Sequence, residues 1–158
     1  AAVVAIPALK QGGRLIIAAR TSDWDHVGSL AYRTNLQLLK LIGAENYNKL
    51  LLSPDWTFIP DQWQVQMWAR VLEKIPQEHL TYFSASMPAA DYQILPGADG
   101  NIYLPENLRY KDDLTLIPRV VEQAVAEAVD CIEKNANKKA SIAYLADGPY
   151  GVPVRSRI

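Results

Sequence analysis

The sequence predicts an α/β fold: a layered, mostly parallel sheet with helices on both faces. The first observation is the continuous apolar run at residues 15–19, which fits a strand buried on both faces. The second is that further strand-like segments, at 79–84 and 141–146, are separated by longer segments whose apolar residues recur at helical spacing. Strands that alternate with helices in this way are typical of an α/β layered sheet.

Size and composition fit one domain, which we expect to span residues 1–158. A chain that is 49% hydrophobic and 21% charged can bury a real core. The net charge of −1, without a long basic run, argues against nucleic-acid binding. No apolar run approaches the roughly 18 residues of a membrane span. Cys131 is the only cysteine, which excludes an internal disulfide and is compatible with the cytoplasm.

The N-terminal residues lead directly into the first strand. Residues 1–11 are rich in Ala and Val, which predicts a short helix, and Gly12-Gly13 ends it. A polar loop at 21–26 follows the strand. In open α/β sheets, ligands bind at the edge formed by the loops that follow the strands. We therefore expect the loops after residues 20, 84 and 146 to meet at one edge.

Two helices follow the polar loop. The longer one is predicted from about residue 27 to residue 42, and Gly43 ends it. A second, short helix covers about 44–52, before a Ser-Pro step. The apolar residues of the longer helix predict its inward face. That face consists of Val27, Leu30, Ala31, Leu38, Leu41 and Ile42.

The most informative stretch is residues 58–75. Asp61 is predicted as the N-cap of a helix, with Gln64 completing a capping box. Trp63 then lies in the first turn, where backbone N–H groups lack partners and the helix dipole is positive. It could floor a site for a small anion, or it could be one more core residue. The apolar stripe behind it consists of Met67, Val71 and Ile75, widened by Trp68 and Leu72.

The second half contains a strand at 79–84, a helical turn at 89–93 and a long loop at 95–113. Pro118 suits the first turn of a long helix, and 141–146 is predicted as a strand. In the strand at 79–84, alternation places Leu80 and Tyr82 on one face and Thr81 and Phe83 on the other. The stripe of the long helix consists of Ile117, Val121, Ala124, Val125, Ala128 and Ile132.

No standard catalytic motif is present. The glycines form neither a dinucleotide-binding pattern nor a Walker A sequence, and no nucleophile elbow occurs. Asp61 is most simply a cap and Asp147 a turn former, although either could accept a hydrogen bond from a substrate hydroxyl. The loop aromatics Trp24 and Tyr150 could wall off a pocket or pack against a neighbouring domain. The carboxylates placed where a site could lie are Asp23, Asp25, Asp61 and Asp147.

Histidine and cysteine give weaker signals. His26, flanked by Asp23 and Asp25, could be a base or a ligand, or simply a solvated loop residue. His79 is predicted as structural or surface, and Cys131 as a buried, inert thiol beside the stripe of the last helix. Because metal-ligand spacing is missing, the sequence predicts no metal site in this chain.

Three segments, in order, resemble motifs of one enzyme family. Residues 10–17 read K-Q-G-G-R-L-I-I and resemble a K-E-G-G-x-I-I strand entry. Residues 59–70 look like an I-P-D-Q-W…A-R signature, and 144–153 are similar to a terminal P-D-G…V segment. The family is that of the nickel-pincer lactate racemases, and the likeness is to its C-terminal domain. Residues 95–113 match worst and are predicted to be an insertion.

The resemblance implies an isomerase that racemises or epimerises a small 2-hydroxy acid at C2. In that family a pyridinium thioamide/thiocarboxylate mononucleotide carries nickel and takes hydride from the substrate carbon. The cofactor-binding lysine, the nickel-ligating histidine and the acid/base histidines belong to an N-terminal domain. That domain is the implied partner of this chain. The resemblance therefore implies that this chain is a lid-like domain with no catalytic residue of its own, inactive when isolated.

The resemblance also implies which residues lie beside substrate or cofactor. Trp63 matches the family's tryptophan, and the loops at 21–29 and 147–152 would line the domain interface. The first loop is longer and bulkier than the family's glycine-rich loop, which puts lactate itself in doubt. A rival hypothesis is a non-catalytic α/β module that binds a small acid or a partner protein. The residues expected near the ligand are Trp63, Gln62, Asp61, Asp147, Tyr150, Asp23 and His26.

Overall fold

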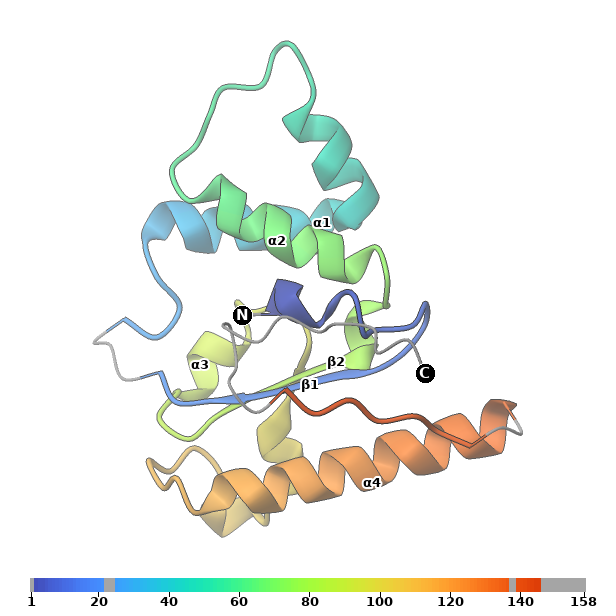
Figure 1. Ribbon diagram of the computed structural model, residues 1–158. Coiled ribbons are helices and arrows are strands. Elements are labelled where there is room, and N and C mark those ends of the chain that lie inside the picture. Colours follow the sequence, from blue (N-terminus) through green and yellow to red (C-terminus); the bar gives the residue numbers. More distant parts are fainter. Residues whose placement is uncertain (1, 22–24, 137–138, 146–158) are drawn as a thin grey trace.

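The strands that the structure describes form one parallel sheet (Figure 1). The computed structural model describes residues 2–21, 25–136 and 139–145. Within them the strands are β1 (Leu15–Ala19), β2 (Leu80–Ser84) and β3 (Ala98–Asp99), in the order β1-β2-β3. Both strand pairs are parallel, and Ala19 pairs with Ser84, so β1 and β2 end at the same edge. The predicted α/β fold with a parallel sheet is confirmed.

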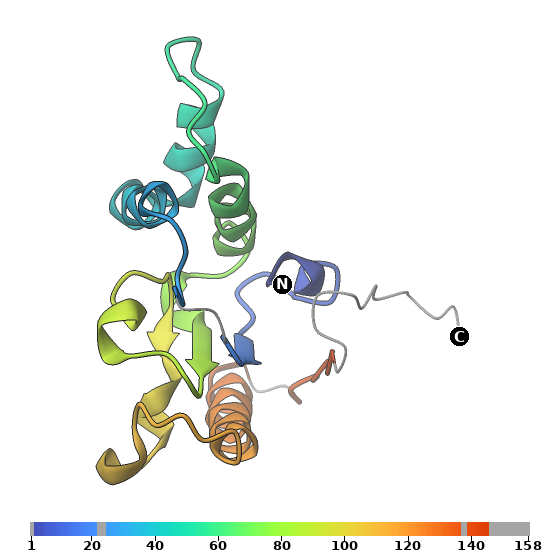
Figure 2. The same cartoon turned by 90° about the vertical axis from the view of Figure 1, so that its left-hand side faces the viewer.

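Helices cover both faces of this sheet, as predicted (Figure 2). On one side, α1 (Leu30–Leu51) packs against α2 (Gln62–Leu72); on the other, α4 (Leu116–Ala136) runs along β1 and β2. Gly43, with φ 78° and ψ 163°, breaks α1 into the two predicted parts. The short helix α3 (Ala89–Tyr92) confirms the predicted turn after β2.

The core is divided between the two faces of the sheet. Leu80 packs with the α2 side and Phe83 with the α4 side, which confirms the predicted alternation along β2. A further cluster lies between α1, α2 and the segment after β2. Its buried members are Val27, Leu36, Leu39, Tyr47, Val65, Ala69, Met87, Tyr92 and Leu95. On the α4 side the buried helix residues are Leu116, Val120, Ala124 and Ala128.

The predicted inward face of the first long helix is confirmed for Val27, Leu38 and Ile42, which belong to or pack against the core, and wrong for Leu30 and Leu41. Leu30 and Leu41 are 79% and 82% exposed, whereas Leu36 and Leu39 are fully buried. The helix begins at Leu30, because the Ser29 hydroxyl accepts a hydrogen bond from the backbone N–H three residues on. The rotation of a helix about its axis is set by its neighbours, and here the buried leucines face α2.

Three predicted segments differ in extent or type. The N-terminal helix at 1–11 is wrong in length, since only the 3₁₀ turn η1 (Ala2–Ala5) forms. The long loop at 95–113 contains β3 and the 3₁₀ helices η3 (Gly100–Tyr103) and η4 (Glu106–Leu108). The strand predicted at 141–146 is wrong over 141–145, where no strand forms and most side chains are exposed. Two residues of β3 complete the sheet instead.

None of the helices in residues 2–21, 25–136 and 139–145 combines the length and the apolar character needed to cross a membrane.

Candidate functional site

A cavity of about 330 Å³ lies between the sheet and α2, on the face away from α4. Ile17 and Ala19 of β1 and Tyr82 of β2 contribute its sheet side. The turn η1 lies beside β1, on the edge away from β3, and closes another side of the cavity (Figure 2). The helices contribute Tyr32 from α1 and Trp63, Gln64, Met67 and Trp68 from α2. We call this cavity the aromatic pocket, because two indoles and two phenols line it.

Trp63 lies on the wall of the aromatic pocket and not in the core. Its side chain is 53% exposed, and Met67, one turn along, is 36% exposed. The face of α2 that packs against α1 carries Val65 and Ala69, which are fully buried. The alternative that Trp63 is a core residue is therefore wrong. In the predicted apolar stripe behind it, Val71 and Ile75 are buried, whereas Met67 is not.

Asp61 occupies the N-cap position but does not cap α2. Its backbone is left-handed, with φ 65°, and its side chain makes no capping hydrogen bond. The predicted capping box is wrong for this reason. The carboxylate accepts a hydrogen bond from the Ser29 hydroxyl at 2.7 Å instead, and that hydroxyl also caps α1 through the Tyr32 N–H. Asp61 therefore holds the starts of α1 and α2 together.

Gln62 has a structural role. Its side-chain oxygen accepts hydrogen bonds from the Ile59 backbone N–H at 2.7 Å and from the Trp56 indole at 3.0 Å. These contacts shape the loop that leads into α2. The amide does not line the aromatic pocket, so the expectation that it lies beside a ligand gains no support from its position.

Two phenols give the aromatic pocket its polar character. The Trp68 indole donates a hydrogen bond to the Tyr32 hydroxyl at 2.8 Å. Burial raises the pKa of Tyr32, with a smaller contribution from the charge of Asp61. Burial also raises the pKa of Tyr82, with a smaller contribution from Tyr32. Both phenols therefore stay protonated at neutral pH and can donate hydrogen bonds to a ligand.

The carboxyl ends of β1 and β2 meet in a cluster of hydroxyls. The Thr21 and Ser84 hydroxyls are 2.7 Å apart, and the Thr21 N–H donates to the Ser84 hydroxyl at 3.2 Å. The Ser86 hydroxyl donates to the Thr21 carbonyl. The predicted meeting of the loops after residues 20 and 84 is confirmed, whereas the loop after 146 lies outside the described residues. Because these hydroxyls bond to one another, they fasten the edge of the sheet.

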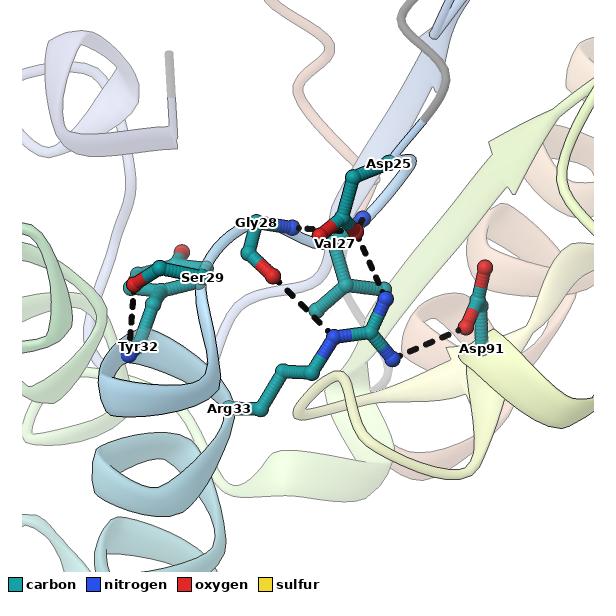
Figure 3. Close-up of polar contacts among 7 residues, drawn as sticks. All are labelled: Asp25, Val27, Gly28, Ser29, Tyr32, Arg33 and Asp91. Carbon is teal, nitrogen blue, oxygen red and sulfur yellow. Dashed lines mark hydrogen bonds and ion pairs between the residues drawn. The ribbon is translucent and has the colours of Figure 1, made fainter.

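Asp25 belongs to an ion-pair network that fixes the start of α1 (Figure 3). Arg33 donates to Asp25 at 2.6 Å, to Asp91 at 3.2 Å and to the Gly28 carbonyl at 3.1 Å. The carboxylate of Asp25 also accepts hydrogen bonds from the backbone of Val27 and Gly28. The Gly28 N–H, and next the Arg33 guanidinium, hold the pKa of Asp25 below its ordinary value. A carboxylate held ionised in this way is a poor general base. Arg33, which pairs with both Asp25 and Asp91, links the loop before α1 to α3.

Of the remaining predicted site residues, the structure describes only His26. His26 is half-buried and does not line the aromatic pocket, and its buried Nδ1 has no hydrogen-bond partner among the described residues. Asp23, Asp147 and Tyr150 lie outside the described residues, as does Trp24. Cys131, predicted as buried, is half-buried, and Arg14 donates a hydrogen bond to its sulfur at 3.2 Å.

The residues of the pocket do not fit a nickel centre. No group of three His, Cys, Asp or Glu side chains that could hold a metal ion occurs in residues 2–21, 25–136 and 139–145. The pocket walls are aromatic and aliphatic, which suits contact with a flat ring, but they carry no metal ligand. We therefore assign no step of a reaction to a metal held by the described part of this chain.

Sequence reasoning missed Tyr32 and Tyr82 as pocket residues and placed Trp68 only in a stripe. One local signal existed for Tyr32: Ser29, three residues earlier, is a good N-cap, which puts Tyr32 in the first turn of α1. A signal also existed for Tyr82. The predicted alternation puts it on the same face of β2 as Leu80, and that face packs against α2. A scan against protein-family models and searches of curated proteins and of solved structures found no match to this chain.

Proposed function

We propose that this chain is the C-terminal, lid-like domain of a 2-hydroxy-acid racemase or epimerase of the lactate racemase type. The single observation that carries the proposal is the position of Trp63. In the segment that resembles the family signature, this residue is half-exposed on the wall of a pocket that can accommodate a small molecule. A solvent-exposed indole on a helix whose opposite face is well packed is typical of a binding surface.

The role of the described residues in this proposal is binding and exclusion of water. Trp63, Met67 and Trp68 offer apolar surface, and the phenols of Tyr32 and Tyr82 offer hydrogen-bond donors. The hydride-accepting cofactor and the acid/base histidines would come from the N-terminal domain. Closing an apolar wall over a reacting centre displaces water and strengthens the polar interactions made there.

The test is Trp63→Ala in the full-length, cofactor-loaded protein, assayed against a panel of 2-hydroxy acids. We expect kcat/KM for the best substrate to fall at least about tenfold, since stacked aromatic contacts contribute about 0.5–1.5 kcal/mol beyond their apolar burial. The melting temperature should stay within a few degrees, because a half-exposed side chain contributes little to core packing. The matched control is Phe58→Ala, an aromatic 66% exposed and outside the pocket. This variant should keep full activity.

Equal activity of the two variants would refute the assignment of Trp63 to the site. The rival, a non-catalytic module, makes a different prediction for the full-length protein. It expects binding of a small acid or a partner protein without inversion at C2 of any 2-hydroxy acid, in the presence of nickel and cofactor. Racemisation by the 158-residue chain alone would contradict both hypotheses, since the first places the reacting groups in another domain and the second assigns no catalysis at all.

A further inference from the structure

Among the residues that the structure describes, those lining the aromatic pocket include no ionised side chain. The polar side chains among them are the two phenols and the neutral amide of Gln64. The other lining side chains are aromatic or aliphatic. A carboxylate moved from water into such surroundings loses several kcal/mol of hydration unless a cation or several donors replace it. The chemistry of the walls therefore favours a neutral, apolar group.

The charges around the pocket also favour a neutral ligand group over an anion. Asp61 stands close enough to Tyr32 that its negative charge raises the pKa of that phenol. Arg33, one residue further along α1, is engaged by Asp25, Asp91 and the Gly28 carbonyl. An anion in the pocket would thus meet a nearby carboxylate and no available guanidinium from α1.

The volume of the pocket and its hydrogen-bond donors further restrict the kind of ligand that fits. A volume of about 330 Å³ lies at the lower end of the range for small-molecule sites, and a methyl group would leave most of it unfilled. The Tyr32 hydroxyl accepts from Trp68, which leaves its own proton to donate. The Tyr82 hydroxyl forms no hydrogen bond to any residue within the described ranges. The pocket therefore offers two O–H donors between flat apolar walls.

We propose that the aromatic pocket binds the neutral, flat side chain of the ligand and excludes its carboxylate. This rests on the proposed function and makes the preferred substrate a 2-hydroxy acid with an aromatic side chain, with lactate a poor one. The carboxylate and C2 then point out of the pocket mouth, toward the surface where the partner domain would bring its cationic and acid/base groups. Trp63 and Met67, the two exposed large apolar residues of α2, form the rim on that side.

The first test uses the 158-residue chain and two probes, 4-methylphenol and lactate. The readout is the ¹H–¹⁵N spectrum of the indole groups, whose resonances are assigned with the single variants Trp56→Phe, Trp63→Phe and Trp68→Phe. We expect 4-methylphenol to shift the resonances of Trp63 and Trp68 saturably, to leave that of Trp56 unchanged, and lactate to shift none. Tyr82→Phe should weaken 4-methylphenol binding about 2- to 10-fold, the effect of one hydrogen bond. Ala19→Phe should abolish it by filling the space.

The result that overturns the proposal is lactate shifting these resonances as strongly as 4-methylphenol, or 4-methylphenol shifting neither. The second test separates this proposal from the proposed function, using full-length, cofactor-loaded protein with lactate and 3-phenyllactate. Racemisation that favours lactate in kcat/KM overturns the pocket assignment and leaves the enzyme assignment intact. Probe binding without racemisation of any 2-hydroxy acid overturns the enzyme assignment and supports the pocket.

Discussion

Gly97 is the position at which the structure predicts the sharpest response to a single added methyl group. Its backbone has φ +111°, a conformation that L-residues rarely adopt. A Cβ built on it would lie 2.7 Å from the Leu80 carbonyl oxygen and 2.9 Å from the Leu80 Cγ. Both atoms belong to the first residue of β2, next to the β2–β3 pairing of Thr81 with Ala98. Neither can move without disturbing the sheet.

The expected loss for Gly97→Ala combines two terms. Left-handed backbone costs a non-glycine residue about 1–2 kcal/mol. Overpacking against atoms that cannot withdraw costs about 1–3 kcal/mol more, and the stiffer unfolded chain returns at most about 1 kcal/mol. We therefore expect the free energy of unfolding to fall by about 2–4 kcal/mol, a large part of the roughly 5–15 kcal/mol that domains possess. Urea denaturation followed by tryptophan fluorescence measures it.

Gly12→Ala is the matched control for this substitution. Gly12 also has positive φ, at +70°, but a Cβ there would have no atom within 4 Å. This variant retains the backbone term and lacks the collision, so its loss should stay near or below about 1 kcal/mol. If the two variants lose the same stability, the collision with Leu80 contributes nothing and the argument from close approach is refuted.

Three further predictions concern buried or paired polar groups. Tyr47→Phe removes the hydroxyl that donates to the Asn35 Oδ1 in the core, and should lower the free energy of unfolding by about 1–2 kcal/mol in urea; an unchanged value would contradict this. Burial raises the pKa of Tyr92 to about 12 from 10.0, so between these pH values the folded state keeps a proton that the unfolded state releases. Stability should therefore fall across that window, and Tyr92→Phe should flatten the fall if the assignment is right. Arg33→Gln should cost about 1 kcal/mol at low salt and less at high salt, because its pair with Asp25 is partly exposed; a salt-independent loss would show that packing dominates.

The parts of the fold that sequence predicted are those encoded locally. The apolar run of β1 and the alternating pattern of β2 each carry their signal within five residues. The break at Gly43 was visible for the same reason. By contrast, β3 has two residues, and nothing in Ala98–Asp99 signals a strand except the partner it meets. The pairing of β3 with β2 depends on the close approach of the two backbones. Gly97 permits this approach, but the composition of the segment does not reveal it.

The site was predictable only in part, for a related reason. Trp63 could be placed at the first turn of a helix from the residues before it, but its exposure depends on which face of α2 meets α1. Tyr32 and Tyr82 come from an α-helix and a strand fifty residues apart, and only packing brings them to one cavity. The same holds for Arg33, whose partners stand before and far after it in the chain.

The unusual start of α2 explains how these residues come together. A side-chain cap normally stabilises a helix start by about 1 kcal/mol, yet Asp61 sits in left-handed backbone and makes no such bond. Its carboxylate instead fixes Ser29, which caps α1 through Tyr32. The Trp68–Tyr32 hydrogen bond then joins the same two helices about two turns further along α2. Two cross-links of this kind set the spacing of α1 and α2 at the pocket. Trp63 lies between them in the sequence of α2, on the exposed face of that helix. The Asp61 side chain thus does not cap α2 but fixes the distance between the α1 and α2 walls of the pocket. A binding site requires such a fixed distance, whereas a core helix does not.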